Sequence, residues 1–143
     1  SSAIVRTILL YGTVPGMSRS NIVLWVKENL EAEKTIQVVN DQFRSPTLAE
    51  DLADGVISVL MFEKTGIWHL SGPEFMSVLD IAKTVAKFWN LNDQLIQEIK
   101  SDALKQPAKR PPVTEFDILK AQTELGFRPH TLWEGLQVLD KQI

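Results

Sequence analysis

The apolar run at the beginning of the chain constrains the fold more than any other feature. In residues 3–12, hydrophobic side chains occur at both odd and even positions. This pattern is typical of a parallel strand that helices cover on both faces. Such a strand lies inside a sheet, yet the run begins at residue 3, so no earlier part of this chain can pair with it. We therefore expect a fragment, or the second half, of a larger protein.

Four Ser or Thr residues are each followed three positions later by an acidic residue, which is the capping box that satisfies free amides at a helix start. Each pair precedes apolar residues at helical spacing, with Leu60 and Ile143 among the expected core positions. A further helix of about ten residues is predicted from Ile22, and Gly126 is placed to end the third capped helix. The four predicted starts are Thr47 with Glu50, Ser77 with Asp80, Thr114 with Asp117, and Thr131 with Glu134.

Short strands are predicted between these helices. Residues 35–39 and 67–70 have strand-like patterns, and residues 96–99 are expected to form a short edge strand. Prolines hold residues 105–112 open as a surface loop. The alternation of strands and helices indicates the α/β class, with a few short strands and about five helices.

The composition limits the classes of function. The chain has 143 residues, of which 44% are hydrophobic and 23% charged, and this suits one globular domain. It has no cysteine, and only His69 and His130 remain as histidine ligands, so no metal site is expected. The net charge of -3 gives no basic surface for nucleic acid, and no apolar run is long enough to span a membrane. We expect a cytoplasmic protein.

The motifs of a catalytic dinucleotide-binding domain are absent from this sequence. Its seven glycines never form the G-x-G-x-x-G pattern that seats a pyrophosphate. The only tyrosine, Tyr11, is followed by Pro15 at the position where a Tyr-x-x-x-Lys pair places its lysine. We therefore assign no catalytic residue to this chain.

Other polar and aromatic residues have structural explanations. The acidic residues at positions 50, 51 and 54 suit the first turn of a helix, whose dipole favours negative charge. His69 has apolar neighbours and is predicted to be packed and hydrogen-bonded in the core. Trp25, Trp89 and Trp133 occupy helical positions where burial in the core is expected.

Five segments carry a resemblance, and they are Arg6-Thr-Ile-Leu-Leu-Tyr11-Gly12, Asp41-Gln-Phe-Arg44-Ser-Pro-Thr47 running into Glu50-Asp51-Leu-Ala53, Ile67-Trp-His-Leu-Ser-Gly72, Arg110-Pro-Pro with Asp117-Ile-Leu-Lys120, and Leu125-Gly-Phe-Arg-Pro129. In this order they resemble the C-terminal half of extended short-chain dehydrogenase/reductases, most closely the dTDP-4-dehydrorhamnose reductase branch. The resemblance covers essentially the whole chain.

The resemblance implies the C-terminal part of an NAD(P)-binding, Rossmann-like protein. Residues 1–143 would be its substrate-binding half, closing over a nucleotide-sugar such as a dTDP-sugar. A separate N-terminal half, absent from this chain, would carry the cofactor glycines and the catalytic Tyr and Lys, and would bind most of the NADPH or NADH. The reaction implied is reduction of a C4 ketone in dTDP-rhamnose biosynthesis, and the family is compatible with a homodimer.

The same resemblance points to two arginines as contacts for the diphosphate, Arg44 and Arg110. A guanidinium can hold phosphate oxygens in a bidentate way, and each charge-assisted bond contributes roughly 1.5 to 3 kcal/mol. The alternative for each arginine is an ion pair with a nearby acidic residue, such as Asp41 or Glu115.

Further polar residues match the family pattern. Gln42, Pro46 and Thr47 would shape the sugar pocket, although helix capping is a sufficient explanation for Thr47. Asn21 lies where the family often places a contact to the nucleotide, and it could equally cap the helix that follows. Leu9 departs from the family pattern, because sugar epimerases often have Asn there and several rhamnose reductases have Trp.

Two other functions remain open at this stage. One is a binding or regulatory protein that kept the reductase architecture without turnover, as in the regulatory subunit of methionine adenosyltransferase. The other is a nucleic-acid adaptor that uses Lys105, Lys109 and Arg110, and the acidic net charge argues against it.

Overall fold

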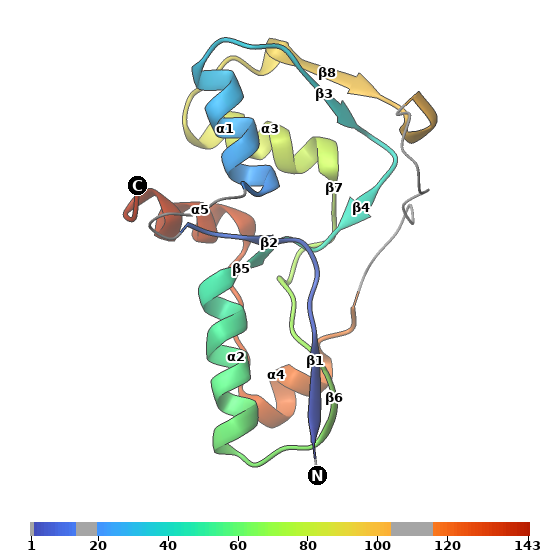
Figure 1. Ribbon diagram of the computed structural model, residues 1–143, viewed down its shortest axis with the longest axis vertical. Helices are drawn as coiled ribbons and strands as arrows, with labels where there is room; N and C mark the ends of the chain where they lie inside the picture. Colours follow the sequence, from blue (N-terminus) through green and yellow to red (C-terminus); the bar gives the residue numbers. More distant parts are fainter. Residues whose placement is uncertain (1, 14–19, 104–115) are drawn as a thin grey trace.

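The computed structural model describes residues 2–13, 20–103 and 116–143. Within these ranges, five α-helices and eight short strands follow one another along the chain. This confirms the predicted α/β class with a few short strands and about five helices. The molecule is elongated, and its elements form two regions joined by short strands (Figure 1).

The lower region of Figure 1 is built on two parallel strands. Strand β1 (Ala3–Arg6) pairs with β6 (Gly66–His69), as predicted for the segment at 67–70. Helix α2 (Ala49–Met61) directly precedes β6 in the chain, and helix α4 (Leu119–Leu125) packs against α2 and β6. We call β1, β6, α2 and α4 the lower region.

The upper region contains the other three helices and a second parallel pair of strands. Helices α1 (Ile22–Glu31) and α3 (Val78–Phe88) pack against each other, and α5 (Leu132–Asp140) packs against α3. Strand β3 (Ile36–Val39) pairs in parallel with β8 (Ile96–Ile99), which confirms both predicted strands. We call these five elements the upper region.

Short strands connect the two regions. Strands β2 and β5 pair in parallel, and β4 and β7 pair in an antiparallel way. Their bounds, with those of two short 3-10 helices, are β2 (Leu10–Tyr11), β4 (Phe43–Arg44), β5 (Thr47–Leu48), β7 (Met76–Ser77), η1 (Asp93–Leu95) and η2 (Ser101–Ala103).

Two predicted helix starts are confirmed in detail. The Ser77 side chain accepts a hydrogen bond from the Asp80 amide at 2.9 Å and caps α3. Thr131 caps α5, and both halves of its capping box with Glu134 are present. Gly126 ends α4 in the left-handed conformation at φ 67°, as predicted for a C-cap glycine.

The other two predicted starts have different outcomes. Thr114 lies outside the described residues, and α4 begins at Leu119, whose amide donates to the Asp117 carboxylate at 2.9 Å. The prediction that Thr47 caps α2 is wrong, because the N-cap residue is Leu48 and it makes no side-chain cap bond. Thr47 is completely buried.

The first strand differs from its prediction in two ways. Leu9 has a positive φ of 41°, which breaks the apolar run into β1 and β2. Ile4 and Ile67 lie opposite each other on β1 and β6 and are 54% and 44% exposed. Only one face of this pair is therefore covered within the described residues, because α2 and α4 pack on the face of Trp68.

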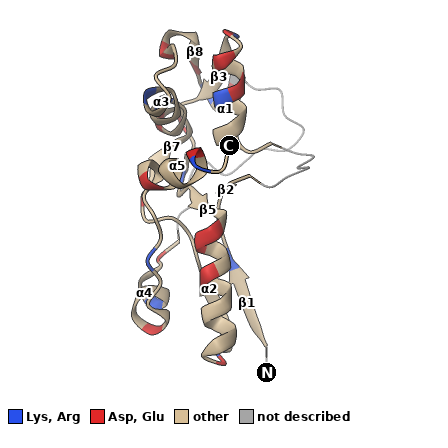
Figure 2. Cartoon of the chain, turned by 90° about the vertical axis from the view of Figure 1, so that its left-hand side faces the viewer, with Lys and Arg blue, Asp and Glu red and all other residues tan. Residues whose placement is uncertain are grey.

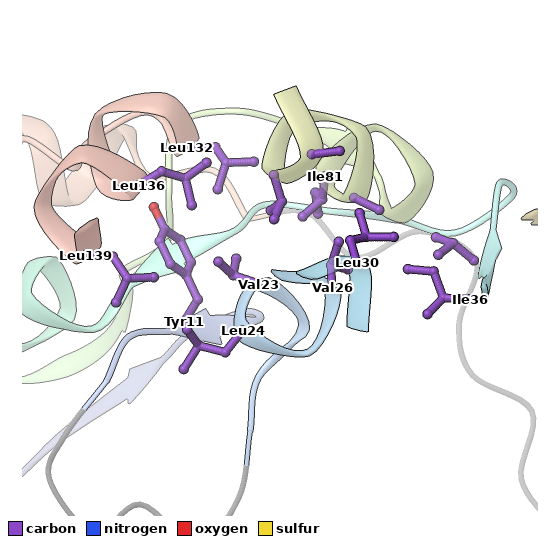
Figure 3. Close-up of a cluster of buried hydrophobic side chains, with 14 of the residues drawn as sticks. Tyr11, Val23, Leu24, Val26, Leu30, Ile36, Ile81, Leu132, Leu136 and Leu139 are labelled. Carbon is purple, nitrogen blue, oxygen red and sulfur yellow. The ribbon is translucent and has the colours of Figure 1, made fainter. Parts of the chain in front are cut away.

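Each region has its own hydrophobic cluster. The upper cluster includes Tyr11 together with side chains from α1, α3 and α5 (Figure 3). The lower cluster lies between α2, α4 and β6, and its buried members are Val59, Trp68, Leu70, Ala121, Leu125 and Phe127.

Several residues expected in the core lie at the surface. Leu60 is 71% exposed, because Gly55 and Val59 define the buried face of α2, and Ile143 is also exposed. Trp25 and Trp133 are exposed as well, whereas Trp89 packs partly buried against the upper cluster. Helical spacing alone therefore predicted a wider buried face on α2 than the structure has.

Candidate functional site

A cavity of about 510 Å³ opens beside α1, β3 and β4. Its volume lies in the range of small-molecule sites in proteins, which is roughly 300 to 1,000 Å³. Residues from separate segments of the chain line it, and those that matter here are Leu9, Asn21, Trp25, Val38, Gln42 and Arg44. Three of the five predicted site residues therefore meet at one cavity.

Asn21 stands at the N-terminal end of α1. Its side-chain oxygen accepts a hydrogen bond from the Leu24 amide at 3.1 Å, and its side-chain nitrogen donates to the Gly12 carbonyl at 2.7 Å. The predicted capping role is thus present. The same bonds fix the amide at the edge of the cavity and tie α1 to the end of β2.

Gln42 and Arg44 reach the cavity from the segment that contains β4. Gln42 is buried, and within the described residues its carboxamide has no hydrogen-bond partner. The Arg44 guanidinium donates to its neighbouring carbonyl, that of Phe43, at 2.7 Å. Asp41, one of the predicted alternative partners of the arginine, accepts hydrogen bonds from the Ser101 amide and hydroxyl, both at 3.0 Å.

The remaining two predicted site residues lie elsewhere. Thr47 is not among the residues that line the cavity, since its hydroxyl donates to the Ile8 carbonyl at 2.6 Å and accepts from the Gly72 amide at 3.1 Å. These two bonds join the connection between β1 and β2 to the segment after β6. Arg110 and the alternative partner Glu115 lie outside the described residues.

Leu9 brings backbone strain to the edge of the cavity. A φ of 41° is uncommon for a residue with a bulky side chain, and such strain often marks a functional position. The Leu9 carbonyl accepts a hydrogen bond from the Thr47 amide at 3.1 Å, which holds the strained conformation in place. The sequence marks Leu9 only as a departure from the family pattern.

Trp25 lines the cavity although its sequence position did not predict this. Its helical position predicted burial, but Trp25 is 38% exposed. The available signal was its position four residues after Asn21, because residues at this spacing share one face of a helix.

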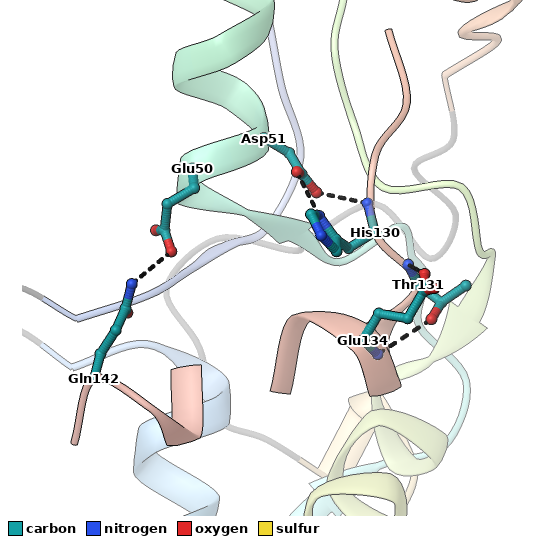
Figure 4. Close-up of polar contacts among 6 residues, drawn as sticks. All are labelled: Glu50, Asp51, His130, Thr131, Glu134 and Gln142. Atoms are coloured by element: carbon teal, nitrogen blue, oxygen red, sulfur yellow. Dashed lines mark hydrogen bonds and ion pairs between the residues drawn. The ribbon is translucent and has the colours of Figure 1, made fainter. Parts of the chain in front are cut away.

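A second polar cluster ties α2 to α5 (Figure 4). The buried Asp51 carboxylate accepts from the His130 amide at 2.7 Å and contacts the His130 ring nitrogen Nδ1, also at 2.7 Å. Glu50 accepts from Gln142 at 2.9 Å. The acidic residues at the start of α2 (Figure 2) therefore do more than complement its helix dipole, because they join the two regions.

Two pKa values are shifted near this cluster. Burial raises the pKa of the Tyr11 hydroxyl well above its ordinary value, and the carboxylates of Asp51 and Glu74 raise it further. Hydrogen bonds from the Thr131 amide and side chain lower the pKa of Glu134. Tyr11 thus keeps its proton at neutral pH.

His69 is packed as predicted. Its ring stacks on Phe116 with the ring centroids 4.4 Å apart. Its Nε2 atom is buried, and within the described ranges it has no hydrogen-bond partner, contrary to the prediction. Throughout residues 2–13, 20–103 and 116–143, no group of three or more metal-ligating side chains occurs. In these same residues no helix is long and apolar enough to cross a membrane.

The fold and the cavity together define a class, an α/β domain with an open cavity beside parallel strands. Residues 1–142 match the family model described as RmlD substrate binding domain. The chain belongs to this family. The resemblance to the substrate-binding half of extended short-chain dehydrogenase/reductases is thereby confirmed.

Two curated relatives show how much of a longer protein the chain matches. The spore coat polysaccharide biosynthesis protein SpsK of Bacillus subtilis (strain 168) is 29% identical over 138 residues, which are 95% of this chain and 46% of that protein. The dTDP-4-keto-6-deoxy-D-glucose reductase of Streptomyces niveus is 26% identical over 130 residues, 91% of this chain and 43% of that protein. The chain thus spans somewhat less than half the length of these relatives.

Solved structures support the same fold. A dTDP-4-dehydrorhamnose reductase from Clostridium acetobutylicum ATCC 824 superposes with a TM-score of 0.82 at 25% identity, covering 98% of this chain and 48% of that one. The corresponding enzyme from Bacillus anthracis str. Ames, in complex with NADP, has a TM-score of 0.83 at 24% identity, covering 99% and 48%. Both neighbours are Rossmann-like proteins about twice as long as the match.

Proposed function

We propose that this chain is the substrate-binding half of an NAD(P)H-dependent nucleotide-sugar reductase that acts on a dTDP-4-dehydrorhamnose-like substrate. One observation carries the proposal. Asn21, Gln42 and Arg44, from separate segments of the chain, line a single cavity of about 510 Å³ in a member of the RmlD substrate binding domain family.

The chemistry of the cavity suits a sugar nucleotide. The Arg44 guanidinium offers planar donors for the diphosphate oxygens, and Arg110 would add a second guanidinium. The buried Gln42 carboxamide can both donate and accept, so it suits sugar hydroxyls or a carbonyl. Asn21, already fixed by two hydrogen bonds, retains one N–H donor for the ligand.

The nicotinamide cofactor does not fit this chain alone. The seven glycines of the chain form no dinucleotide-binding fingerprint. We therefore assign the cofactor, which supplies the hydride when bound, to a separate dinucleotide-binding half. The residues of this chain bind and orient the nucleotide-sugar so that its C4 ketone faces that half.

The exposed face of β1 and β6 supports the proposal that a second half of the protein covers the lower region. In parallel sheets both faces are normally buried, yet Ile4 and Ile67 are about half exposed. Within the described residues, β1 has a paired neighbour on one edge only, which is β6. An additional strand and helix layer would pair with the open edge of β1 and bury both isoleucines.

The test is the affinity of the complete protein for dTDP, measured by calorimetric titration. Arg44→Ala should weaken binding by roughly 10- to 100-fold, because a charge-assisted hydrogen bond contributes roughly 1.5 to 3 kcal/mol. Arg128→Ala is the matched control, since this arginine lies away from the cavity and donates to the Gln122 and Phe127 carbonyls. Unchanged affinity in Arg44→Ala would remove this residue from the site.

An activity assay distinguishes a reductase from a binding or regulatory homologue without turnover. The complete protein should oxidise NADPH or NADH in the presence of dTDP-4-dehydrorhamnose. Tight dTDP binding without measurable reduction, even at high protein concentration, would instead favour the regulatory function.

A further inference from the structure

Trp25 differs from the other three tryptophans of the chain. Trp68 lies under a lysine ammonium, and Trp89 and Trp133 both pack edge-on against the same phenylalanine ring. Within the described residues, the Trp25 ring has no aromatic partner, no cation over it and no hydrogen bond to its indole N–H. A large aromatic ring with 38% exposure and no partner is available to a ligand.

The ring lies where a ligand would meet it. Asn21 is the N-cap residue of α1 and Trp25 follows four residues later, so the two lie on one face of the helix, a turn apart. Trp25 also lines the same cavity as Gln42 and Arg44, together with the apolar side chain of Val38 from β3. The cavity therefore combines a flat apolar surface with a guanidinium and amides.

This combination matches the parts of a nucleoside diphosphate. The guanidinium suits the diphosphate, and an aromatic face suits a heterocyclic base, because bases stack on indole rings. We propose that Trp25 stacks on the base of the nucleotide and contributes to selection of a nucleoside diphosphate over simple sugar phosphates. This inference rests on the proposed function, since it assumes that the cavity holds a nucleotide-sugar.

The experiment measures dTDP affinity in the complete protein for three substitutions at one position. Stacking is worth roughly 1 to 3 kcal/mol per base, so Trp25→Ala and Trp25→Leu should each raise the Kd for dTDP by about 5-fold or more. Trp25→Phe should stay within about threefold of the original protein, because it keeps an aromatic face. Trp133→Ala, an exposed tryptophan outside the cavity, is the control and should bind dTDP normally.

Fluorescence gives an independent reading of the stacking. A base stacked on an indole quenches its emission, so dTDP should quench the original protein and the Trp133→Ala protein. In Trp25→Phe, which still binds dTDP, this quenching should disappear. Thermal unfolding of each variant checks that the fold is retained.

The possible failures are distinguishable. If Trp25→Ala binds dTDP as tightly as the original protein, or Trp25→Leu binds as well as Trp25→Phe, the stacking inference is wrong and the proposed function stands. Quenching that persists in Trp25→Phe also contradicts it. If the original protein binds no nucleoside diphosphate, the proposed function and the inference both fail.

Discussion

The upper and lower regions differ in how completely they bury their apolar residues. Among the residues that the structure describes, the upper cluster has sixteen buried members, drawn from three helices and several strands, whereas the lower cluster has six. The cavity lies in the upper region, beside α1 and β3. The difference teaches that the region beside the cavity buries more of its apolar side chains than the lower region, which leaves Ile4 and Ile67 about half exposed.

Helix α2 makes the contrast plain. Its buried face carries Gly55 and Val59, but Ile57, Leu60 and Met61 on its other side are more than half exposed. Isolated exposed hydrophobic residues are ordinary, whereas a contiguous group is a feature of an interface. The uncovered strands and this helix side belong to the same region, as expected if a second half of the protein covers it.

The largest predicted effect comes from breaking a backbone contact between two segments that connect the regions, the turn before β5 and the segment after β6. A methyl group at Gly72 would lie 1.8 Å from the Pro46 carbonyl oxygen, and backbone atoms cannot yield as a flexible side chain does. We expect Gly72→Ala to lower the free energy of unfolding by more than about 4 kcal/mol, with both regions lost together. Urea unfolding followed by circular dichroism measures this. A loss below about 1 kcal/mol would show that the two regions do not depend on this contact.

A matched pair of truncations compares the two clusters directly. Leu136 is 0% exposed in the upper cluster, and Leu125 is 7% exposed in the smaller lower cluster. We expect Leu136→Ala to cost about 3 to 5 kcal/mol and Leu125→Ala about 2 to 3 kcal/mol, because a site near the surface can collapse around the lost atoms. Denaturant midpoints of the two variants provide the measurement. Equal or reversed costs would contradict the difference between the clusters.

The smallest predicted effect is a dependence on alkaline pH, specific to the upper region. The pKa of Tyr11 is raised in the folded state, so the unfolded chain loses this proton near pH 10 while the folded chain keeps it. The contribution of this proton to the free energy of unfolding is fully present well below pH 10 and is lost as the pH rises. At pH 11 the loss is about 1.4 kcal/mol relative to neutral pH.

Tyr11→Phe is the variant that isolates this effect. The tyrosine hydroxyl is buried and has no partner among the described residues, so its removal should leave stability at pH 7 nearly unchanged. Between pH 9 and pH 11, the free energy of unfolding should fall by about 1.4 kcal/mol less in the variant than in the original protein. Denaturant unfolding at each pH measures this difference. An identical alkaline decline in both proteins would exclude Tyr11 as its source.

Local signals in the sequence predicted the helices well. Ser77 and Thr131 satisfy free amides of their own helices, so nearby residues are sufficient to identify them. Thr47 has the same local pattern, yet its hydroxyl bonds to the Ile8 carbonyl and the Gly72 amide. Partners so far away in the sequence cannot be predicted from spacing.

The site could be predicted only in part, for the same reason. Family motifs identified Asn21, Gln42 and Arg44, which meet at the cavity. Trp25 belongs to no motif, and its exposure depends on how α1 lies against β3. Leu9 takes a strained conformation, and its carbonyl accepts a hydrogen bond from the amide of Thr47, a residue far away in the sequence.

A crystal structure of the complete protein with bound dTDP tests the central claim most directly. We predict that the nucleotide occupies the cavity beside α1 and β3, with its diphosphate within hydrogen-bonding distance of the Arg44 guanidinium and the Asn21 amide at its edge. A second half of the protein should cover Ile4 and Ile67. A nucleotide bound elsewhere, with this cavity left free, would contradict the account.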